Sequence, residues 1–117
     1  MKKISEKHIL AWFTLAECVA RNEKERALGM YKLLSHSIED PAYSALLEAD
    51  LRLSFGDTQY AYEKYAQAVQ LYAQSGRVQQ AQGVYDHLHQ LDNHTDRYEW
   101  LMQELTLASS ATNNYKR

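Results

Sequence analysis

The chain has 117 residues, of which 45% are hydrophobic and 24% charged, and its net charge is −2. This length suits one domain, and the composition is typical of a soluble globular protein. Basic and acidic residues are interleaved, so the sequence lacks the basic face with which a protein binds nucleic acid.

The N-terminal apolar stretch predicts neither a signal peptide nor a membrane span. It runs from Ile9 to Phe13, is broken by Thr14 and Glu17, and lacks a cleavage site of small residues. We therefore expect no membrane partner. The single cysteine, Cys18, cannot form an internal disulfide, which favours a reducing, cytoplasmic location.

Apolar residues recur with the 3.6-residue period of a helix along most of the chain, and four glycines and one proline are too few for a turn-rich β protein. Asn22, with Glu25 three residues later, resembles a capping box, and Asp40-Pro41 is a strong helix start. Gly56-Asp57 and Ser75-Gly76 are turn signals. Six helices are predicted, at about 5–21, 23–36, 41–55, 58–74, 77–91 and 96–109.

The connections between these helices are very short, which predicts antiparallel neighbours in an all-α fold. One domain is expected to cover residues 5–109. Residues 110–117 are polar and have no apolar period, so we expect a frayed tail there.

Two segments 34 residues apart repeat the same residue types at the same offsets. They are Asn22-Glu23, Ala27, Tyr31 and Leu34, then Gly56-Asp57, Ala61, Tyr65 and Ala68. Self-similarity at a fixed period is typical of stacked helical repeats. It favours a solenoid, and an ordinary helical bundle with a chance period is the alternative.

The pattern resembles the tetratricopeptide repeat (TPR) family, whose unit is a 34-residue pair of antiparallel helices. The first unit carries Trp12, Leu15, Ala16, Val19, Ala27, Tyr31 and Leu34, and the second Leu46, Ala49, Leu53, Ala61, Tyr65 and Ala68. A degenerate third unit has Ala81, Val84, Tyr85 and Leu88. The resemblance implies a right-handed superhelix with units at about 8–39, 42–74 and 77–109.

Catalytic and metal-binding patterns are weak, and we expect no enzyme activity, no cofactor and no bound metal. Cys18 is interpreted as a small apolar filler of the first helix. His87, His89 and His94 form the histidine cluster of the chain, but His87 and His89 lie two apart on a helix and point to different faces, so they cannot both bind one ion. The four glycines are isolated, so no phosphate-binding loop is present.

The resemblance implies a concave groove lined by the first helix of each pair. In the register set by Trp12, the groove residues are Leu10, Phe13, Glu17, Arg21, Leu47, Leu51, Gln82, Asp86 and His89. The apolar members predict a strip that binds protein, with a basic group of the partner near Glu17 or Asp86. The alternative is that these residues are core, because the register differs by one or neighbouring helices cover them.

We therefore expect a non-enzymatic module that binds an apolar or amphipathic peptide or helix of another protein in this groove. The basic ring with which many TPR domains bind chaperone tails is missing. The alternatives are a small chaperone that masks a client segment, as TPR-type chaperones do in type III secretion, and a self-associating scaffold, for example a homodimer.

Overall fold

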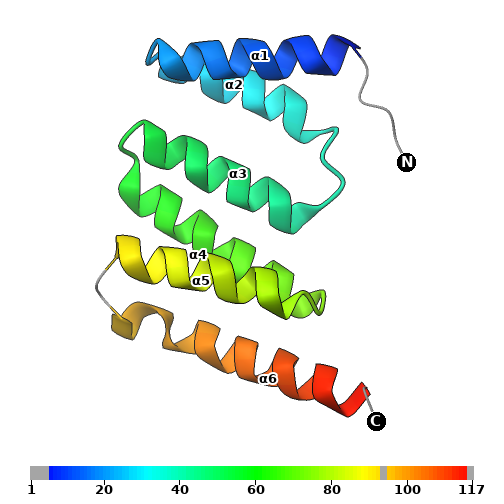
Figure 1. Cartoon of the computed structure of the whole chain (residues 1–117). Helices are drawn as coiled ribbons and strands as arrows, with labels where there is room; N and C mark the ends of the chain where they lie inside the picture. Colours follow the sequence, from blue (N-terminus) through cyan, green and yellow to red (C-terminus); the bar gives the residue numbers. More distant parts are fainter. Residues whose placement is uncertain (1–5, 93–94, 116–117) are drawn as a thin grey trace.

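The computed structural model describes residues 6–92 and 95–115, with the side chains of residues 10–92 and 97–110. The secondary-structure elements of these residues are all helices, as predicted, and successive helices run in opposite directions and follow one another in chain order (Figure 1). The elements are α1 (Glu6–Ala20), α2 (Lys24–Ser35), α3 (Pro41–Ser54), α4 (Thr58–Gln74), α5 (Val78–Leu91), the 3₁₀ turn η1 (Thr95–Tyr98) and α6 (Glu99–Tyr115).

Three of the turns have the same backbone geometry. Asn22, Gly56 and Gly76 adopt φ values of 59°, 80° and 79°, the left-handed region in which glycine is least strained. In each turn the next residue donates its N–H to the carbonyl five residues earlier, as from Asp57 to Arg52 at 3.0 Å. The predicted capping box at Asn22 is wrong, because Asn22 ends α1 and the Glu23 side chain makes no capping bond to α2.

The connection between α2 and α3 has a different design. It covers residues 36–40, and its last residue, Asp40, accepts a hydrogen bond from the Ala42 N–H at 3.1 Å, while Pro41 is the first residue of α3. The predicted helix start at Asp40-Pro41 is therefore confirmed. The longer connection allows α3 to lie farther from α2 than a three-residue turn would allow.

The buried side chains form two clusters. The larger is built from α3 to α6, with α4 against α3, α5 and α6 and with Tyr65, Val69, Leu88 and Leu101 fully buried. The smaller is built from α1 and α2, and Leu51 of α3 completes it. The Cα atoms extend over 46 × 38 × 16 Å, so the molecule is a flat slab.

Polar side chains join turns that are far apart in sequence. Three pairs do so: Lys24 with Asp57 at 2.8 Å, Arg77 with Asp40 at 2.9 Å, and Arg97 with Gln59 at 3.5 Å. Their sequence separations are 33, 37 and 38 residues. These pairs are partly exposed, so they align successive helix pairs more than they stabilise them.

The C-terminal boundary differs from the prediction. The backbone of α6 is helical to Tyr115, where a frayed tail was expected from residue 110. No glycine or proline follows Leu107, so nothing in this stretch stops the helix even though its residues are polar. Residues 116–117 of the expected tail lie outside the described residues.

Candidate functional site

An apolar hollow of about 350 Å³ opens between α1 and α3. From α1 it is lined by Trp12, Leu15, Ala16 and Val19, from α2 by Tyr31, and from α3 by Leu47, Asp50, Leu51 and Ser54. The α1 residues recur at three- and four-residue intervals and therefore lie on one helix face. The hollow offers an apolar surface with a single charged side chain in its described lining, Asp50.

The hollow exists because α1 and α2 pack on the remainder of the protein through a narrow seam. Leu51 is the α3 residue that enters the α1–α2 cluster, with Leu47, Ile38 and Phe55 partly buried against it. The longer connection at 36–40 separates α2 from α3, and neighbouring side chains fill the resulting space only in part.

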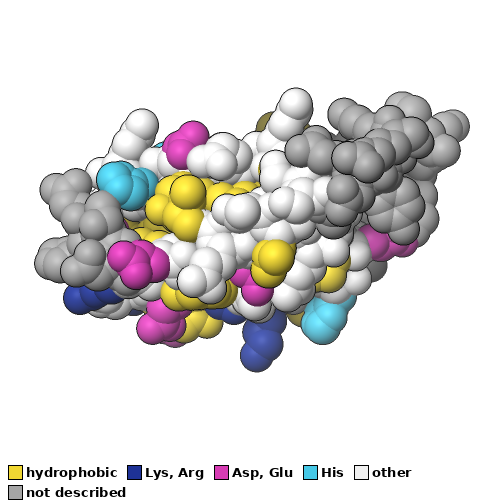
Figure 2. Space-filling model, turned by 90° about the horizontal axis from the view of Figure 1, so that it is seen from below, with side chains coloured by type: hydrophobic (Ala, Val, Ile, Leu, Met, Phe, Trp, Pro, Cys, Tyr) yellow, Lys and Arg dark blue, Asp and Glu magenta, His cyan; other side chains and the backbone are white. Residues whose placement is uncertain are grey.

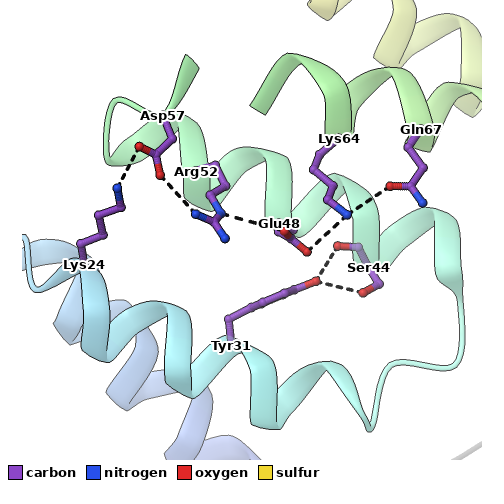
Figure 3. Close-up of polar contacts among 8 residues, drawn as sticks. All are labelled: Lys24, Tyr31, Ser44, Glu48, Arg52, Asp57, Lys64 and Gln67. Carbon is purple, nitrogen blue, oxygen red and sulfur yellow. Dashed lines mark hydrogen bonds and ion pairs between the residues drawn. The ribbon is translucent and has the colours of Figure 1, made fainter. Parts of the chain in front are cut away.

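Tyr31 holds this seam from the α2 side. Its ring is 6% exposed, and its hydroxyl donates to the Ser44 carbonyl oxygen at 2.6 Å, with the Ser44 hydroxyl 2.9 Å away (Figure 3). Burial is the main cause that raises the pKa of Tyr31, so the phenol remains a neutral donor at physiological pH. Tyr31 therefore ties α2 to the first turn of α3 while lining the hollow.

Of the predicted groove residues, Leu47 and Leu51 lie in the hollow. Leu51 is only 7% exposed and belongs to a core cluster, so it serves packing as well as the hollow wall. Leu10 and Phe13, at 66% and 69% exposed, lie on α1 outside the hollow. The neighbouring side chains Trp12, Ala16 and Val19 take the place beside α3 that Phe13 was expected to take.

The two charged groove residues predicted in the first unit, Glu17 of α1 and Arg21 in the turn after it, pair with each other. Arg21 lies 2.7 Å from Glu17, one helical turn away, and both side chains are more than half exposed. Such a pair contributes little stability and leaves Glu17 partly neutralised.

The groove residues predicted on α5 do not reach the hollow. Gln82 donates a hydrogen bond to Asp86 at 2.9 Å, and the ring of His89 lies 6.2 Å from that of Tyr85. All three predicted residues, Gln82, Asp86 and His89, are exposed. The structure therefore brings together the predicted α3 leucines but not the α1 and α5 members of the set.

A second hollow, of about 460 Å³, lies on the other side of the same seam and has a mixed lining, whose charged residues are Glu25, Lys32, Glu48 and Arg52. Beside it, a charged network in which Lys24, Arg52 and Lys64 alternate with Asp57 and Glu48 extends over distances of 2.8 to 3.9 Å (Figure 3). The hydrogen bond from Lys24 is the main cause that lowers the pKa of Asp57. Of the charged residues that line the second hollow, Glu48 and Arg52 belong to this network.

A third hollow, of about 440 Å³, lies between α4 and α6 and is lined by polar and aromatic residues, among them Gln59, Arg97 and Trp100. Within the described range, no three His, Cys, Asp or Glu side chains are grouped so that they could hold a metal ion. Cys18 is buried at 2% exposure, and the ring of His87 packs edge-on against Tyr65. His94 of the predicted histidine cluster lies outside the described residues.

Comparison with known proteins identifies no relative: no family model, curated protein or solved structure matches the chain. None of the described helices is both long enough and apolar enough to cross a membrane.

From the sequence, Trp12, Ala16 and Val19 were expected as members of the first repeat pattern and not as groove residues, and Asp50 was not expected to line the groove. One signal was available. The three-residue turns recur at 21–23, 55–57 and 75–77, whereas the α2–α3 connection has five residues, which marks this seam as different. No pattern in the sequence shows on which side of the seam a hollow opens.

Proposed function

We propose that the chain is a TPR-like helical repeat protein, without enzymatic activity, that binds an amphipathic segment of another protein through the hollow between α1 and α3. Support for the repeat architecture comes from the matching turns at Asn22 and Gly56 and from the polar pairs that join turns 33 to 38 residues apart. A right-handed superhelix of three units would place α1, α3 and α5 on one concave side.

The observation that carries the proposal is the apolar lining of the hollow. Trp12, Val19 and Leu47 remain partly exposed beside one another in a space large enough for one or two apolar side chains. Exposed apolar surface of this kind, rimmed by polar residues, is typical of protein contact sites. A helix or extended segment would insert its apolar residues there and leave its polar face in water.

The test is to fill the hollow without disturbing the core. Ala16 is exposed and lines the hollow, whereas Ala20, one turn later on α1, is exposed and does not. We expect Ala16→Trp to occupy the space and Ala20→Trp to serve as the matched control. Circular dichroism and thermal melting establish that both variants are folded.

The probe is a phage-displayed library of random peptides of about twelve residues, long enough for three helical turns. Wild-type protein and Ala20→Trp should enrich peptides with apolar residues at helical spacing, and Ala16→Trp should bind the selected peptides more than about tenfold more weakly. Equal binding by all three proteins, or no enrichment by any, contradicts the proposal.

A self-associating scaffold is the second candidate, because the two terminal helices also carry exposed apolar residues. They are Leu10 and Phe13 on α1 and Trp100, Met102 and Leu107 on α6. Seen from the α6 end, hydrophobic side chains lie at the surface beside acidic and histidine side chains (Figure 2). Light scattering over a range of protein concentrations separates this candidate from a chaperone, whose self-association should end when client peptide is added.

A further inference from the structure

The hollow between α1 and α3 has one charged side chain in its described lining, the carboxylate of Asp50. Asp50 lies on α3 between Leu47 and Leu51 in sequence, and it is exposed although the hollow beside it is apolar. A carboxylate that served only solubility would not need to line an apolar hollow. Its position raises the question of which group it meets when the hollow is filled.

Tyr65 holds the Asp50 carboxylate in one orientation. The Tyr65 hydroxyl donates to Asp50 Oδ1 at 2.5 Å. The Tyr65 ring is completely buried in the larger core cluster and makes a T-shaped contact with the ring of His87, with 5.2 Å between the ring centroids. Burial, followed by the bond to Asp50, raises the pKa of Tyr65 far above its usual value. The tyrosine therefore remains a donor, and the carboxylate is supported by a rigid element.

Asp50 also differs from the other acidic residues that were expected to meet a partner. Glu17 already pairs with Arg21 at 2.7 Å, and Asp86 accepts a hydrogen bond from Gln82 at 2.9 Å while lying outside the hollow. In the described part of the chain, no lysine or arginine forms an ion pair with Asp50. The negative charge at the hollow thus has a fixed direction and no cation of its own.

We propose that Asp50 selects a lysine or arginine in the segment that occupies the hollow. This inference rests on the proposed function. The aliphatic stem of such a side chain can lie along Leu47 and Leu51 while its charged head reaches the free oxygen of Asp50. The partner is then a segment of another protein that carries apolar residues with one basic residue about a helical turn away.

Two variants test the inference with the same peptide library. Asp50→Asn removes the charge but keeps an oxygen that can accept the Tyr65 hydrogen bond. Asp86→Asn is the matched control, because it removes an exposed carboxylate outside the hollow. The folding of both variants is established by circular dichroism and thermal melting.

Wild-type protein and Asp86→Asn should enrich peptides in which Lys or Arg accompanies the apolar residues. Asp50→Asn should lose this preference and bind the selected peptides about three- to tenfold more weakly, with a smaller dependence on salt. Replacing the basic residue of a selected peptide by Gln should weaken binding to wild type by the same factor and leave binding to Asp50→Asn unchanged.

The possible failures are distinguishable. Enrichment of apolar peptides with no basic residue, or an unchanged basic preference in Asp50→Asn, overturns the role of Asp50 and leaves the binding function intact. If the library yields no peptide whose binding is abolished by Ala16→Trp, the binding function itself is overturned. A homodimer of the wild type that dissociates in Asp50→Asn would also overturn the inference, because the hollow would then be occupied by a second copy.

Discussion

Tyr31 and Tyr65 are 34 residues apart and occupy the same place in the repeated pattern, yet their surroundings differ. Tyr65 is completely buried among α3, α4 and α5 and bonds Asp50. Tyr31 is nearly buried, bonds Ser44, and has a hollow on each side of it. The same residue type at the same repeat position therefore lies in two kinds of seam. The seam between α4 and α5, at Tyr65, is closed, and the seam between α2 and α3, at Tyr31, is open.

The difference follows from the two connections. Residues 75–77 join α4 to α5 in a tight turn with Gly76 at φ 79°, whereas the five residues 36–40 join α2 to α3 without a left-handed residue. A tight turn brings the next helix into full contact, and a longer connection does not. At the open seam, Trp12, Val19 and Leu47 stay partly exposed, whereas Tyr65, Val69 and Leu88 are fully buried at the closed seam.

The largest expected effect is the loss of stability caused by a substitution in the closed seam. Tyr65→Ala removes a fully buried ring and its hydrogen bond, and should lower the free energy of unfolding by about 3–5 kcal/mol. Tyr31→Ala should cost less, about 2 kcal/mol, because water already reaches both sides of its seam. Urea unfolding measures both values, and equal losses for the two variants would contradict the distinction between the seams.

A smaller effect is expected from the residue that joins the two clusters. Leu51 is 7% exposed and is the α3 residue buried in the α1–α2 cluster, so Leu51→Ala should cost about 2–4 kcal/mol. Phe13→Ala, at a side chain 69% exposed outside both clusters, should change stability by less than about 0.5 kcal/mol. A large loss for Phe13→Ala in the same unfolding experiment would mean that Phe13 packs in the folded protein.

The smallest expected effect is on the pH dependence of stability. The hydrogen bond from Arg77 is the main cause that lowers the pKa of Asp40 below its ordinary 3.8, and Lys24 has the same role for Asp57. Because the folded pKa values are depressed, this stabilisation is present above about pH 3.8 and is lost as the pH falls through the folded values.

Arg77→Met and Lys24→Met distinguish the contributions of the Asp40–Arg77 and Asp57–Lys24 pairs to this pH dependence. Both should flatten the fall in melting temperature between about pH 5 and pH 2, and Arg77→Met should flatten it more, because Asp57 keeps a second cation, Arg52 at 3.3 Å. Identical acid profiles for Arg77→Met and the wild type would show that the Asp40–Arg77 pair contributes no stability.

Most of the helices could be predicted from the sequence because their signals are local. Asp40-Pro41 begins α3, and Gly56 and Gly76 end helices in the left-handed conformation, as expected from residues next to one another in the chain. One of the incorrect predictions also concerns a local signal. Asn22 was taken to begin a helix and instead ends one, since asparagine suits both roles.

The candidate site was less predictable. Leu47 and Leu51 were placed in the groove, but whether Phe13 or Trp12 lies beside them depends on the rotation of α1 against α3. A change of one residue rotates a helix face by about 100°, and the period of the sequence alone does not define that rotation. Asp50 could not be identified, because its significance depends on Tyr65 on another helix.

The residue pattern along the chain is enough to predict that this protein is helical and where most helices begin and end, because hydrogen bonds within a helix and the chemistry of short turns involve residues a few positions apart. Which seam is open and which carboxylate lines the hollow are visible only in the folded structure. Both depend on the distances between helices, which result from packing among residues far apart in the chain.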